Sequence, residues 1–214
     1  MLQLQLPDRL IITHTQAAHA EALEALQRLV FPHLAEEERL HADQYRQHLK
    51  VFPEGQFVAL ADGQVVGGTT TMRYRADLSH ITPHRFYEIM GGGWLSTHQP
   101  DGNWLYGLDV SVHPEYRQRG IARGFYRVRQ YLCRELGLAG QLIVGMLNGY
   151  QRYSEMMTVE EYYEKVLKGE LFDPTVSVQI KIGFSPVALM KDYLHDATCG
   201  NAGVLMVLPA EADL

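Results

Sequence analysis

Residues 104–126 read Trp104-Leu-Tyr-Gly-Leu-Asp-Val-Ser-Val-His-Pro-Glu-Tyr-Arg-Gln-Arg-Gly-Ile-Ala-Arg-Gly-Phe-Tyr126, and this stretch decides the fold. The part from Leu105 to Val112 is rich in β-branched and other apolar residues, and Pro114 follows it, so we expect a strand. A helix is expected to begin near Arg119, because apolar side chains then recur at spacings of three and four residues. These side chains are Ile121, Phe125, Val128, Leu132 and Leu136.

The turn between this strand and this helix has the chemistry of an anion site. The first backbone N–H groups of a helix have no internal partner, and the helix dipole makes that end positive. Gly120 lets a ligand approach the backbone because it has no Cβ, and Ala122 is nearly as small. Arg117 and Arg119 add positive charge. We therefore predict that a phosphate or pyrophosphate binds at this turn, although an ordinary strand–helix corner remains the alternative.

Two other phosphate-binding loops fit these residues less well. A Walker P-loop needs Gly-Lys-Ser/Thr, which does not follow Gly120. A Rossmann loop needs a preceding pair of glycines and a βαβ repeat, and the sequence around Gly120 has neither. The more specific pattern is a strand, then His113-Pro-Glu-Tyr-Arg, then Arg117-x-x-Gly120-x-Ala122.

Composition limits the class of protein. The chain has 214 residues, of which 46% are hydrophobic, so we expect a single domain at residues 1–214 with a good core. The formal net charge of −6 argues against a general nucleic-acid binder. The arginines near 117–134 are then a local positive patch, which favours a small anionic ligand over a long polyanion.

Metal, disulfide and membrane signals are missing from the sequence. Cys133 and Cys199 lack C-x-x-C spacing, and the ten histidines show no His-Glu-x-x-His pattern. Cys133 lies beside the apolar helix face and is expected to pack rather than to react. The N-terminus has no signal-peptide pattern, and no stretch approaches the roughly 18 apolar residues of a membrane span. We expect a cytoplasmic protein with no metal and no membrane partner.

The rest of the chain predicts an alternation of helices and strands. Gly67-Gly68 indicates a bulge or a close backbone approach, Thr158 and Glu161 match a helix capping box, and Glu36 to Glu38 are expected to form a solvated helix face. The expected elements are a strand at 9–13, a helix capped by Thr15 and ended by Phe31, a helix at 35–50, a hairpin at 56–74 turning at Asp62-Gly63, a strand at 141–147, a helix from Thr158 to Lys168, a helix from Asp173 to Gly183, and closing strands at 184–194 and 203–208.

Residues 77–103 form an unusually long connector. It contains the flexible run Gly91-Gly-Gly-Trp94. Long connectors inside compact domains are often functional, although a plain surface loop is the alternative. His98 and Glu88 are its candidates to face a substrate.

Together these residues resemble the GNAT family of N-acetyltransferases. The pattern Arg117-x-x-Gly120-x-Ala122 is similar to that family's acetyl-CoA pyrophosphate loop, and the order of elements matches the GNAT fold over nearly the whole chain. The likeness is most specific to the acetyltransferase domain found beside nitrilase-type carbon–nitrogen hydrolases, although no such hydrolase domain fits in this chain. It rests on residues 105–117, Thr97-His98-x-Pro100-Asp101-Gly102, Gly149-Tyr150-x-x-Tyr153, Met157-Thr-Val-Glu-Glu-Tyr162 and Asp173-Pro-Thr-Val-Ser-Val-Gln-Ile-x-x-Gly183-Phe184.

The resemblance implies a fold and a co-substrate. The fold is α/β (α+β), with a mixed, mostly antiparallel central sheet of about seven strands flanked by helices. Its two central strands, 105–112 and 141–147, would part and leave a V-shaped cleft for acetyl-CoA, with the pantetheine arm on the first strand and the pyrophosphate on residues 117–122. The implied contacts are Val110, Ser111, Val112, Arg117, Gln118, Arg119, Gly120, Ile121, Ala122 and Arg123.

The resemblance also implies direct attack of an amine on the thioester in a ternary complex. A backbone N–H of the strand would stabilise the oxyanion, and an acid would protonate the departing thiolate. Many family members supply that acid as the Tyr of Tyr-x-x-x-Gly-Phe, but this position is Gln179, whose amide cannot protonate a thiolate. The candidates are then Tyr153 and Tyr150, with packing or substrate shaping as their alternative role and water as a further proton source.

Asp109 is the best candidate for the base. Ideal alternation puts Gly107, Asp109 and Ser111 on one face of the strand, and Leu108, Val110 and Val112 on the other. Burial among apolar neighbours would raise the pKa of the carboxyl group and make it a better base near neutral pH. A structural carboxylate is the alternative reading, and Glu88 is a weaker rival for the role.

We therefore expect an acyl-CoA-dependent N-acyltransferase that moves an acetyl group to a primary amine of a small molecule. One alternative is a catalytically degenerate module that binds acyl-CoA as a sensor or scaffold, and another is a nucleotide-binding protein. The acceptor half of the site is expected in residues 77–103 and 148–175. A homodimer is compatible with this class of protein.

Overall fold

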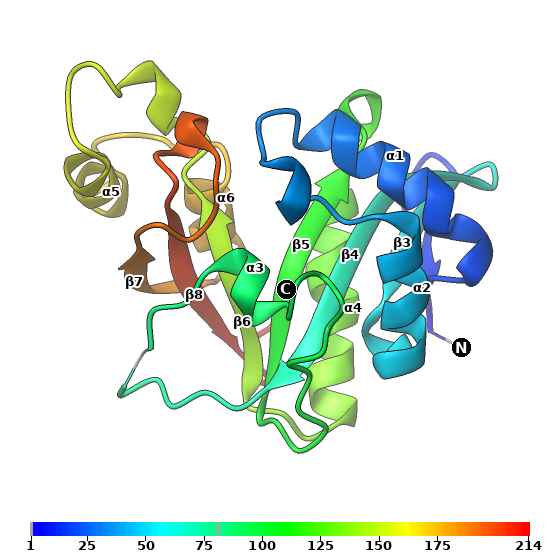
Figure 1. The fold of residues 1–214 in the computed structure, drawn as a ribbon. Coiled ribbons are helices and arrows are strands. Elements are labelled where there is room, and N and C mark those ends of the chain that lie inside the picture. Colours follow the sequence, from blue (N-terminus) through cyan, green and yellow to red (C-terminus); the bar gives the residue numbers. More distant parts are fainter. Residues whose placement is uncertain (1, 81) are drawn as a thin grey trace.

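The computed structural model describes residues 2–80 and 82–214, which form a single mixed sheet with helices on both faces (Figure 1). Within the described residues the sheet has eight strands in the order β1-β2-β3-β4-β5-β6-β8-β7, and only β5 and β6 are parallel neighbours. The additional strand, β1, is a three-residue edge strand that the sequence did not predict. The strands are β1 (Gln3–Gln5), β2 (Leu10–His14), β3 (Phe57–Ala61), β4 (Gln64–Tyr74), β5 (Trp104–Val112), β6 (Gly140–Met146), β7 (Ser185–Met190) and β8 (Gly203–Pro209).

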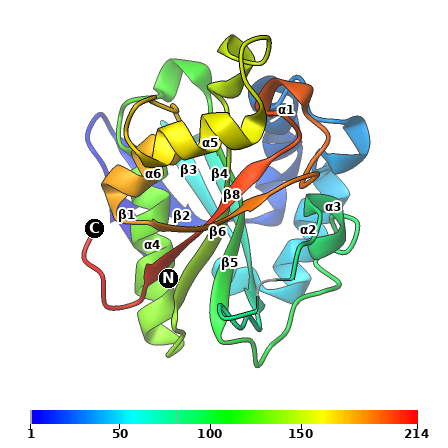
Figure 2. The same cartoon turned by 90° about the vertical axis from the view of Figure 1, so that its left-hand side faces the viewer.

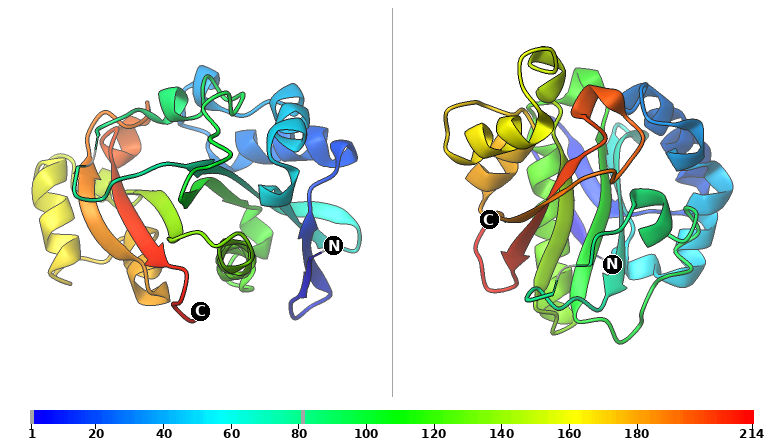
Figure 3. Two further views of the ribbon diagram at one scale, coloured as in Figure 1. Left: turned by 90° about the horizontal axis from the view of Figure 1, so that it is seen from below. Right: turned by 60° about the vertical axis from the view of Figure 1, so that its left-hand side comes forward.

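The helices divide between the two faces of the sheet. Figure 2 and Figure 3 show α1, α2 and α3 on one face, and α4 with α6 on the other. The two neighbouring glycines of β4 locate these faces, because a Cβ on Gly67 would meet Ile121 of α4 and one on Gly68 would meet Leu23 of α1. Helix side chains therefore pack directly on the backbone of β4 here, and the register shift against β3 beside Gly67 shows the bulge that was the other expectation. The helices are α1 (Ala20–Val30), α2 (Ala42–Val51), α3 (Phe86–Ile89), α4 (Ile121–Glu135), α5 (Val159–Leu167) and α6 (Val176–Ile182).

The parallel strands β5 and β6 pair over only three residues. Their register joins Leu105 to Gln141, Tyr106 to Leu142 and Gly107 to Ile143, and then pairing stops. Both strands continue past this last rung, β5 to residue 112 and β6 to residue 146. Figure 1 shows them diverging toward their carboxyl ends. The expected parting of the two central strands is therefore confirmed, and we call this unpaired region the split.

A β-bulge lies on β5 immediately after the last rung. Against β4, Thr71 pairs with Gly107 and Thr70 pairs with Asp109, so Leu108 is an extra residue without a cross-strand partner. An extra residue in one strand shifts the side-chain alternation by one position.

This bulge overturns part of the predicted alternation. The space of a Cβ on Gly107 is filled by Arg129 of α4, whereas Asp109 and Ser111 both bond to Gln27 of α1 on the opposite face. The prediction that Gly107 shares a face with Asp109 and Ser111 is therefore wrong. Its physical cause is the extra residue Leu108, which places two consecutive side chains on the α1 face.

Several local predictions are confirmed and others need correction. The β3–β4 hairpin turns at Asp62-Gly63, and Thr158 with Glu161 forms the expected capping box. The first helix is instead preceded by a short 3₁₀ turn whose cap is Gln16, not Thr15, and the strand expected at 184–194 ends at residue 190. The 35–50 segment is a 3₁₀ turn (Glu36–Glu38) followed by α2, and Glu38 is only 3% exposed rather than solvated.

Helix α2 fixes the glycine-rich part of the connector. Gln44 Nε2 donates to the carbonyl oxygen of Gly92 at 2.9 Å. The His48 ring, which is fully buried, places Nε2 2.7 Å from the carbonyl oxygen of Gly93. A carbonyl can only accept, so Nε2 carries the hydrogen. Burial disfavours the imidazolium form and lowers the pKa of His48 to about 4.

This lowered pKa predicts a loss of stability in acid. The ordinary pKa near 6.5 applies to the unfolded chain, so neutral His48 stabilises the fold above pH 6.5, and that stability is lost as the pH falls toward 4. The loss from this residue should reach about 2 kcal/mol at pH 5. Urea unfolding at several pH values should show a shallower acid loss in His48→Gln than in the wild type. The exposed-site control His33→Gln should keep the full loss, and an unchanged pH slope in His48→Gln would contradict the assignment.

Candidate functional site

The turn from β5 into α4 is open and positively charged. Gly120 is the N-cap of α4 with φ 81°, a left-handed conformation that suits glycine, and no atom of residues 2–80 and 82–214 outside its chain neighbours lies within 4 Å of the position its Cβ would take. Gln118 also has a positive φ of 63°. Arg117 and Arg119 are exposed, and the Arg119 guanidinium lies over the Tyr116 ring at 5.0 Å. The first N–H groups of a 15-residue helix therefore lie beside an exposed glycine and two exposed arginines, of which Arg117 also donates from Nε to the Val112 carbonyl at 3.3 Å.

The residues on either side of this turn have different roles in packing. Ile121 is buried and packs in one hydrophobic cluster with Val110 and Val112, which fixes the start of α4 against β5. Ala122 is half-buried and Arg123 is exposed at the helix start. Beyond the last rung, the edge of β5 that faces β6 carries backbone groups that no strand of the described residues pairs with.

Asp109 lies on the α1 face, two residues beyond the last rung. Its Oδ1 accepts the backbone N–H of Thr70 at 2.6 Å, and its Oδ2 accepts Gln27 Nε2 at 2.7 Å and Ser111 Oγ at 3.1 Å. Burial raises the pKa of Asp109, while the Thr70 N–H, the Arg129 charge and the Ser111 hydroxyl oppose that rise. The carboxylate is thus both perturbed and firmly positioned. Sequence reasoning missed Gln27, because a glutamine within an amphipathic helix gives no local signal of burial.

Arg129 lies on the opposite, α4 face of the same strand. Its side chain is 1% exposed, and it donates to Thr69 Oγ1 and, at 2.6 Å, to the backbone carbonyl of Asp109. No carboxylate of the described chain forms a salt bridge with it, and its Nε has no hydrogen-bond partner there. The missing side chain of Gly107 makes room for the guanidinium. A buried positive charge without a salt-bridge partner among the described residues therefore lies beneath the last rung, and the Asp109 carboxylate on the other face is the nearest negative charge that acts on it.

Across the split, Gln179 of α6 is 7% exposed and lies against β6. Its Nε2 donates to the hydroxyl of Tyr126 on α4 at 3.0 Å. Its Oε1 occupies the space where a Cβ on Gly145 would lie, and it has no hydrogen-bond partner in the described residues. Gly145 is two residues beyond the last rung, so this amide borders the split.

The two predicted acid candidates lie in the segment that follows β6. The Tyr150 hydroxyl donates to the carbonyl of Met157 at 3.1 Å, and the Tyr153 ring packs on Tyr162 at 5.4 Å. Buried Asp173 fixes the segment by accepting the Gly149 N–H at 2.8 Å and the Tyr162 hydroxyl at 3.0 Å.

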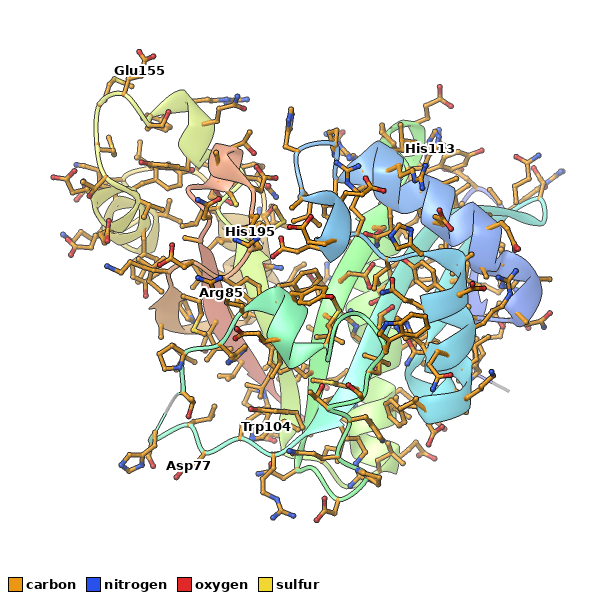
Figure 4. The ribbon with its side chains drawn as sticks, in the orientation of Figure 1. Asp77, Arg85, Trp104, His113, Glu155 and His195 are labelled. Atoms are coloured by element: carbon orange, nitrogen blue, oxygen red, sulfur yellow. The ribbon has the colours of Figure 1, made fainter. Side chains whose placement is uncertain are left out.

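No hydrogen bond within the described chain joins either of these tyrosines to Asp109. Figure 4 shows Glu155 at the outer tip of this segment and His113 near the start of α4, on the other side of the split. The structure therefore does not bring Tyr150 or Tyr153 together with the candidate base by direct contact.

The two connector candidates make structural contacts. The His98 ring stacks on Phe52 at 4.9 Å, and its Nδ1 accepts the Arg73 N–H at 3.2 Å. The Glu88 carboxylate accepts the Arg85 N–H at the start of α3. Another residue of the connector, and neither of these two candidates, makes a polar contact beside the paired part of β5: His84 Nε2 lies 2.8 Å from the Tyr106 hydroxyl.

A bridge joins the two sides of the split on the α1 face. The Glu38 carboxylate accepts the His195 N–H at 2.7 Å, and its other oxygen lies 3.2 Å from His195 Nδ1. Ala35 N–H donates back to the His195 carbonyl at 3.0 Å. His195 is labelled in Figure 4. This bridge links the segment before α2 to the segment after β7, and it accounts for the buried Glu38.

Two further findings concern metals and membranes. Among residues 2–80 and 82–214, no three His, Cys, Asp or Glu side chains gather as metal ligands would. None of the helices described has the length and apolar character needed to cross a membrane.

Comparisons with known proteins find relatives of the chain in sequence and in fold. The model of the acetyltransferase (GNAT) family matches residues 20–148. "Uncharacterized N-acetyltransferase YkwB" of Bacillus subtilis (strain 168) is 32% identical over 200 residues, which cover 93% of this chain and 88% of that protein. "Probable hydrolase YhcX" of the same organism is 33% identical over 190 residues, which cover 89% of this chain but only 36% of that protein.

A solved structure shows the same fold. "GphF GNAT-like decarboxylase in complex with isobutyryl-CoA" superposes with a TM-score of 0.77 at 20% identity, covering 94% of this chain and 99% of that chain. The chain thus spans about a third of the length of the longer curated relative and most of the shorter one.

Proposed function

This chain belongs to the acetyltransferase (GNAT) family, and on that premise we propose that it transfers an acetyl group from acetyl-CoA to a primary amine of a small molecule. Family membership makes it an acyl-CoA-dependent N-acyltransferase; the amine acceptor, the direct attack and the residue roles are our proposal. The observation that supports them best is the split. It leaves one edge of β5 without a strand partner between the positive turn at Gly120 and the carboxylate of Asp109.

In this proposal the donor binds along β5 and the start of α4. The pyrophosphate accepts backbone N–H groups at residues 117–122, and the Arg117, Arg119 and Arg123 side chains add charge. The pantetheine arm bonds the backbone edge from Val110 to Val112 that β6 leaves without a strand partner in the described residues, where the Arg117 Nε already donates to the Val112 carbonyl.

The acceptor attacks from the α1 face, where Asp109 is placed. The amine nitrogen bonds to the thioester carbon, and Asp109 takes the proton that the nitrogen loses. A carboxylate has about four acceptor positions, and the three donors on Asp109 leave one for this proton. A backbone N–H of β5 stabilises the oxyanion before the C–S bond breaks. Tyr150 and Tyr153 shape the acceptor side, because the Asp173 contacts fix their segment beside β6.

We propose a single acetyltransferase domain across residues 1–214, since both hydrophobic clusters pack against the same sheet.

A second candidate function rests on Gln179: a module that binds acyl-CoA without turnover. The two functions separate in an assay that follows thiol release from acetyl-CoA with a panel of a polyamine, an aminoglycoside and an amino acid. Binding of CoA without amine-dependent thiol release would favour the module.

The phosphate-binding turn can be tested with Gly120→Asp. A side chain at this left-handed position would be strained, and its carboxylate would repel the pyrophosphate, so the affinity for CoA should fall at least tenfold, or about 1.4 kcal/mol. Isothermal titration calorimetry measures this affinity. Gly137→Asp is the matched control, because it also has a positive φ with open space but lies at the other end of α4. Equal CoA affinity in both variants would remove the turn from the site.

The base can be tested with Asp109→Asn. Turnover should fall by about 10²-fold, the scale of general base catalysis, with little change in the KM for acetyl-CoA. The defect should be largest at neutral pH and below, because free amine becomes more abundant as the pH rises. Asp101→Asn, at an exposed carboxylate of the connector, is the control. Wild-type turnover in Asp109→Asn, with circular dichroism showing an intact fold, would assign Asp109 a structural role only.

A further inference from the structure

Tyr126 is held rigidly on the α4 face of the split. Its ring meets the Phe184 ring edge-on at 5.0 Å, and the Arg129 guanidinium lies 5.7 Å from the ring centre. The residue is only 5% exposed. Its hydroxyl oxygen accepts the N–H of Gln179, and this long-range bond joins α4 to α6.

The Tyr126–Gln179 pair lies opposite Asp109 across the split. Gln179 contacts β6 at Gly145, two residues beyond the last rung, and Asp109 is two residues beyond the same rung on β5. The faces also differ, since Asp109 bonds to α1 whereas Tyr126 and Gln179 belong to α4 and α6. A thioester placed in the split would therefore have a carboxylate on one side and a phenol on the other.

Two polar groups of the Tyr126–Gln179 pair remain available to hydrogen-bond a ligand. With the amide nitrogen assigned as the donor, the phenol oxygen acts as an acceptor, and its own O–H is available. The Gln179 Oε1 is buried and has no donor in the described residues. A buried carbonyl oxygen without a partner is destabilising, and an incoming N–H donor would remove that cost. The end of a pantetheine arm presents an amide N–H and a sulfur atom.

Two opposing effects act on the proton of Tyr126, and burial, which keeps the hydroxyl protonated, is the larger. Burial raises the pKa of Tyr126, and the Arg129 guanidinium and the Gln179 N–H oppose that rise. Arg129 forms no salt bridge in the described residues, and its charge acts on both Asp109 and Tyr126, so it would help to stabilise a transient phenolate.

We propose that Tyr126, positioned by Gln179, is the catalytic acid that protonates the departing CoA thiolate. This inference rests on the proposed function. When the tetrahedral adduct collapses, the electron pair of the C–S bond stays on sulfur, and sulfur takes the hydroxyl proton of Tyr126. The phenolate then recovers a proton from solvent. The amine nitrogen loses two protons in forming the amide, one to solvent before attack and one to Asp109, so the reaction releases one proton in total.

The kinetic test compares two tyrosines of one helix. Tyr126→Phe should lower kcat by about tenfold to a hundredfold with little change in the KM for acetyl-CoA, because general acid catalysis acts on the transition state. Tyr131→Phe, five residues further along α4 and 49% exposed, should keep wild-type kcat. Adding Gln179→Tyr to Tyr126→Phe returns a phenol to the same corner and should restore part of the lost kcat. Wild-type kcat in Tyr126→Phe would overturn the proposal.

A second measurement on the wild-type protein does not depend on turnover. The ¹³Cζ resonance of Tyr126, assigned with Tyr126→Phe, should shift when CoA is added and shift much less with desulfo-CoA, which lacks the sulfur. An equal response to both ligands, or none, would overturn the proposal. Absence of thiol release from acetyl-CoA with every amine in the wild type would instead overturn the proposed function, so the two failures are distinguishable.

Discussion

The structure depends on a backbone interaction that ends early. β5 and β6 are the only parallel neighbours in the described sheet, and their pairing stops after three residues. Backbone N–H and C=O groups past that point need partners, since leaving them buried and unpaired is costly. The groups nearby are arranged around this need: Gly107 and Gly145 leave room beside the strands, and Arg129 and Gln179 fill that room with polar atoms. An incoming ligand that carries amide groups can complete the same pattern.

The bulge at Leu108 gives this region two chemically distinct faces. It turns Asp109 toward α1, while Gly107 still faces α4 and Arg129. Arg129 then bonds the carbonyl of Asp109 and the hydroxyl of Thr69, so the same guanidinium that charges one face also fixes the strand that carries the carboxylate on the other. In the proposed reaction the base, Asp109, and the acid, Tyr126, can therefore act from opposite faces of the sheet without contacting each other. The bridge between Glu38 and His195 closes the α1 face by joining segments from both sides of the split.

Local sequence signals predicted the elements but not the long-range pairs. The apolar spacing from Ile121, the glycine at 120 and the capping box at Thr158 each act within a few residues, and the helices they predict are present. The prediction that β5 and β6 part came from the family resemblance and not from a local sequence signal. The bulge was not predicted because ideal alternation assumes that every residue has a cross-strand partner. Gly107, next to Leu108, was the available local signal, since a glycine inside a strand often marks a bulge.

The site residues that were missed share a physical cause. Gln27 and Arg129 look like ordinary polar positions on helices, and only tertiary packing buries them; Gln179 was named for its place in the family motif, but its burial was not predicted. Gln179 meets Tyr126 across 53 residues, and Glu38 meets His195 across 157. Such pairs leave no periodic trace in a single sequence. The sequence showed that Gln179 replaces the tyrosine found in many family members. It did not show that the phenol of Tyr126 lies beside Gln179.

Hydrogen exchange tests most directly the claim that the split binds the donor along β5. Amide N–H groups of residues 108–112 on the edge without a partner strand should exchange readily in the free protein and become protected when acetyl-CoA binds. Residues 105–107 lie between two paired strands, β4 and β6, so the exchange of their amide N–H groups should change little. Protection of the Gly120 turn together with part of residues 108–112 is the predicted result. Acetyl-CoA binding that leaves the exchange of residues 108–112 unchanged would contradict the account.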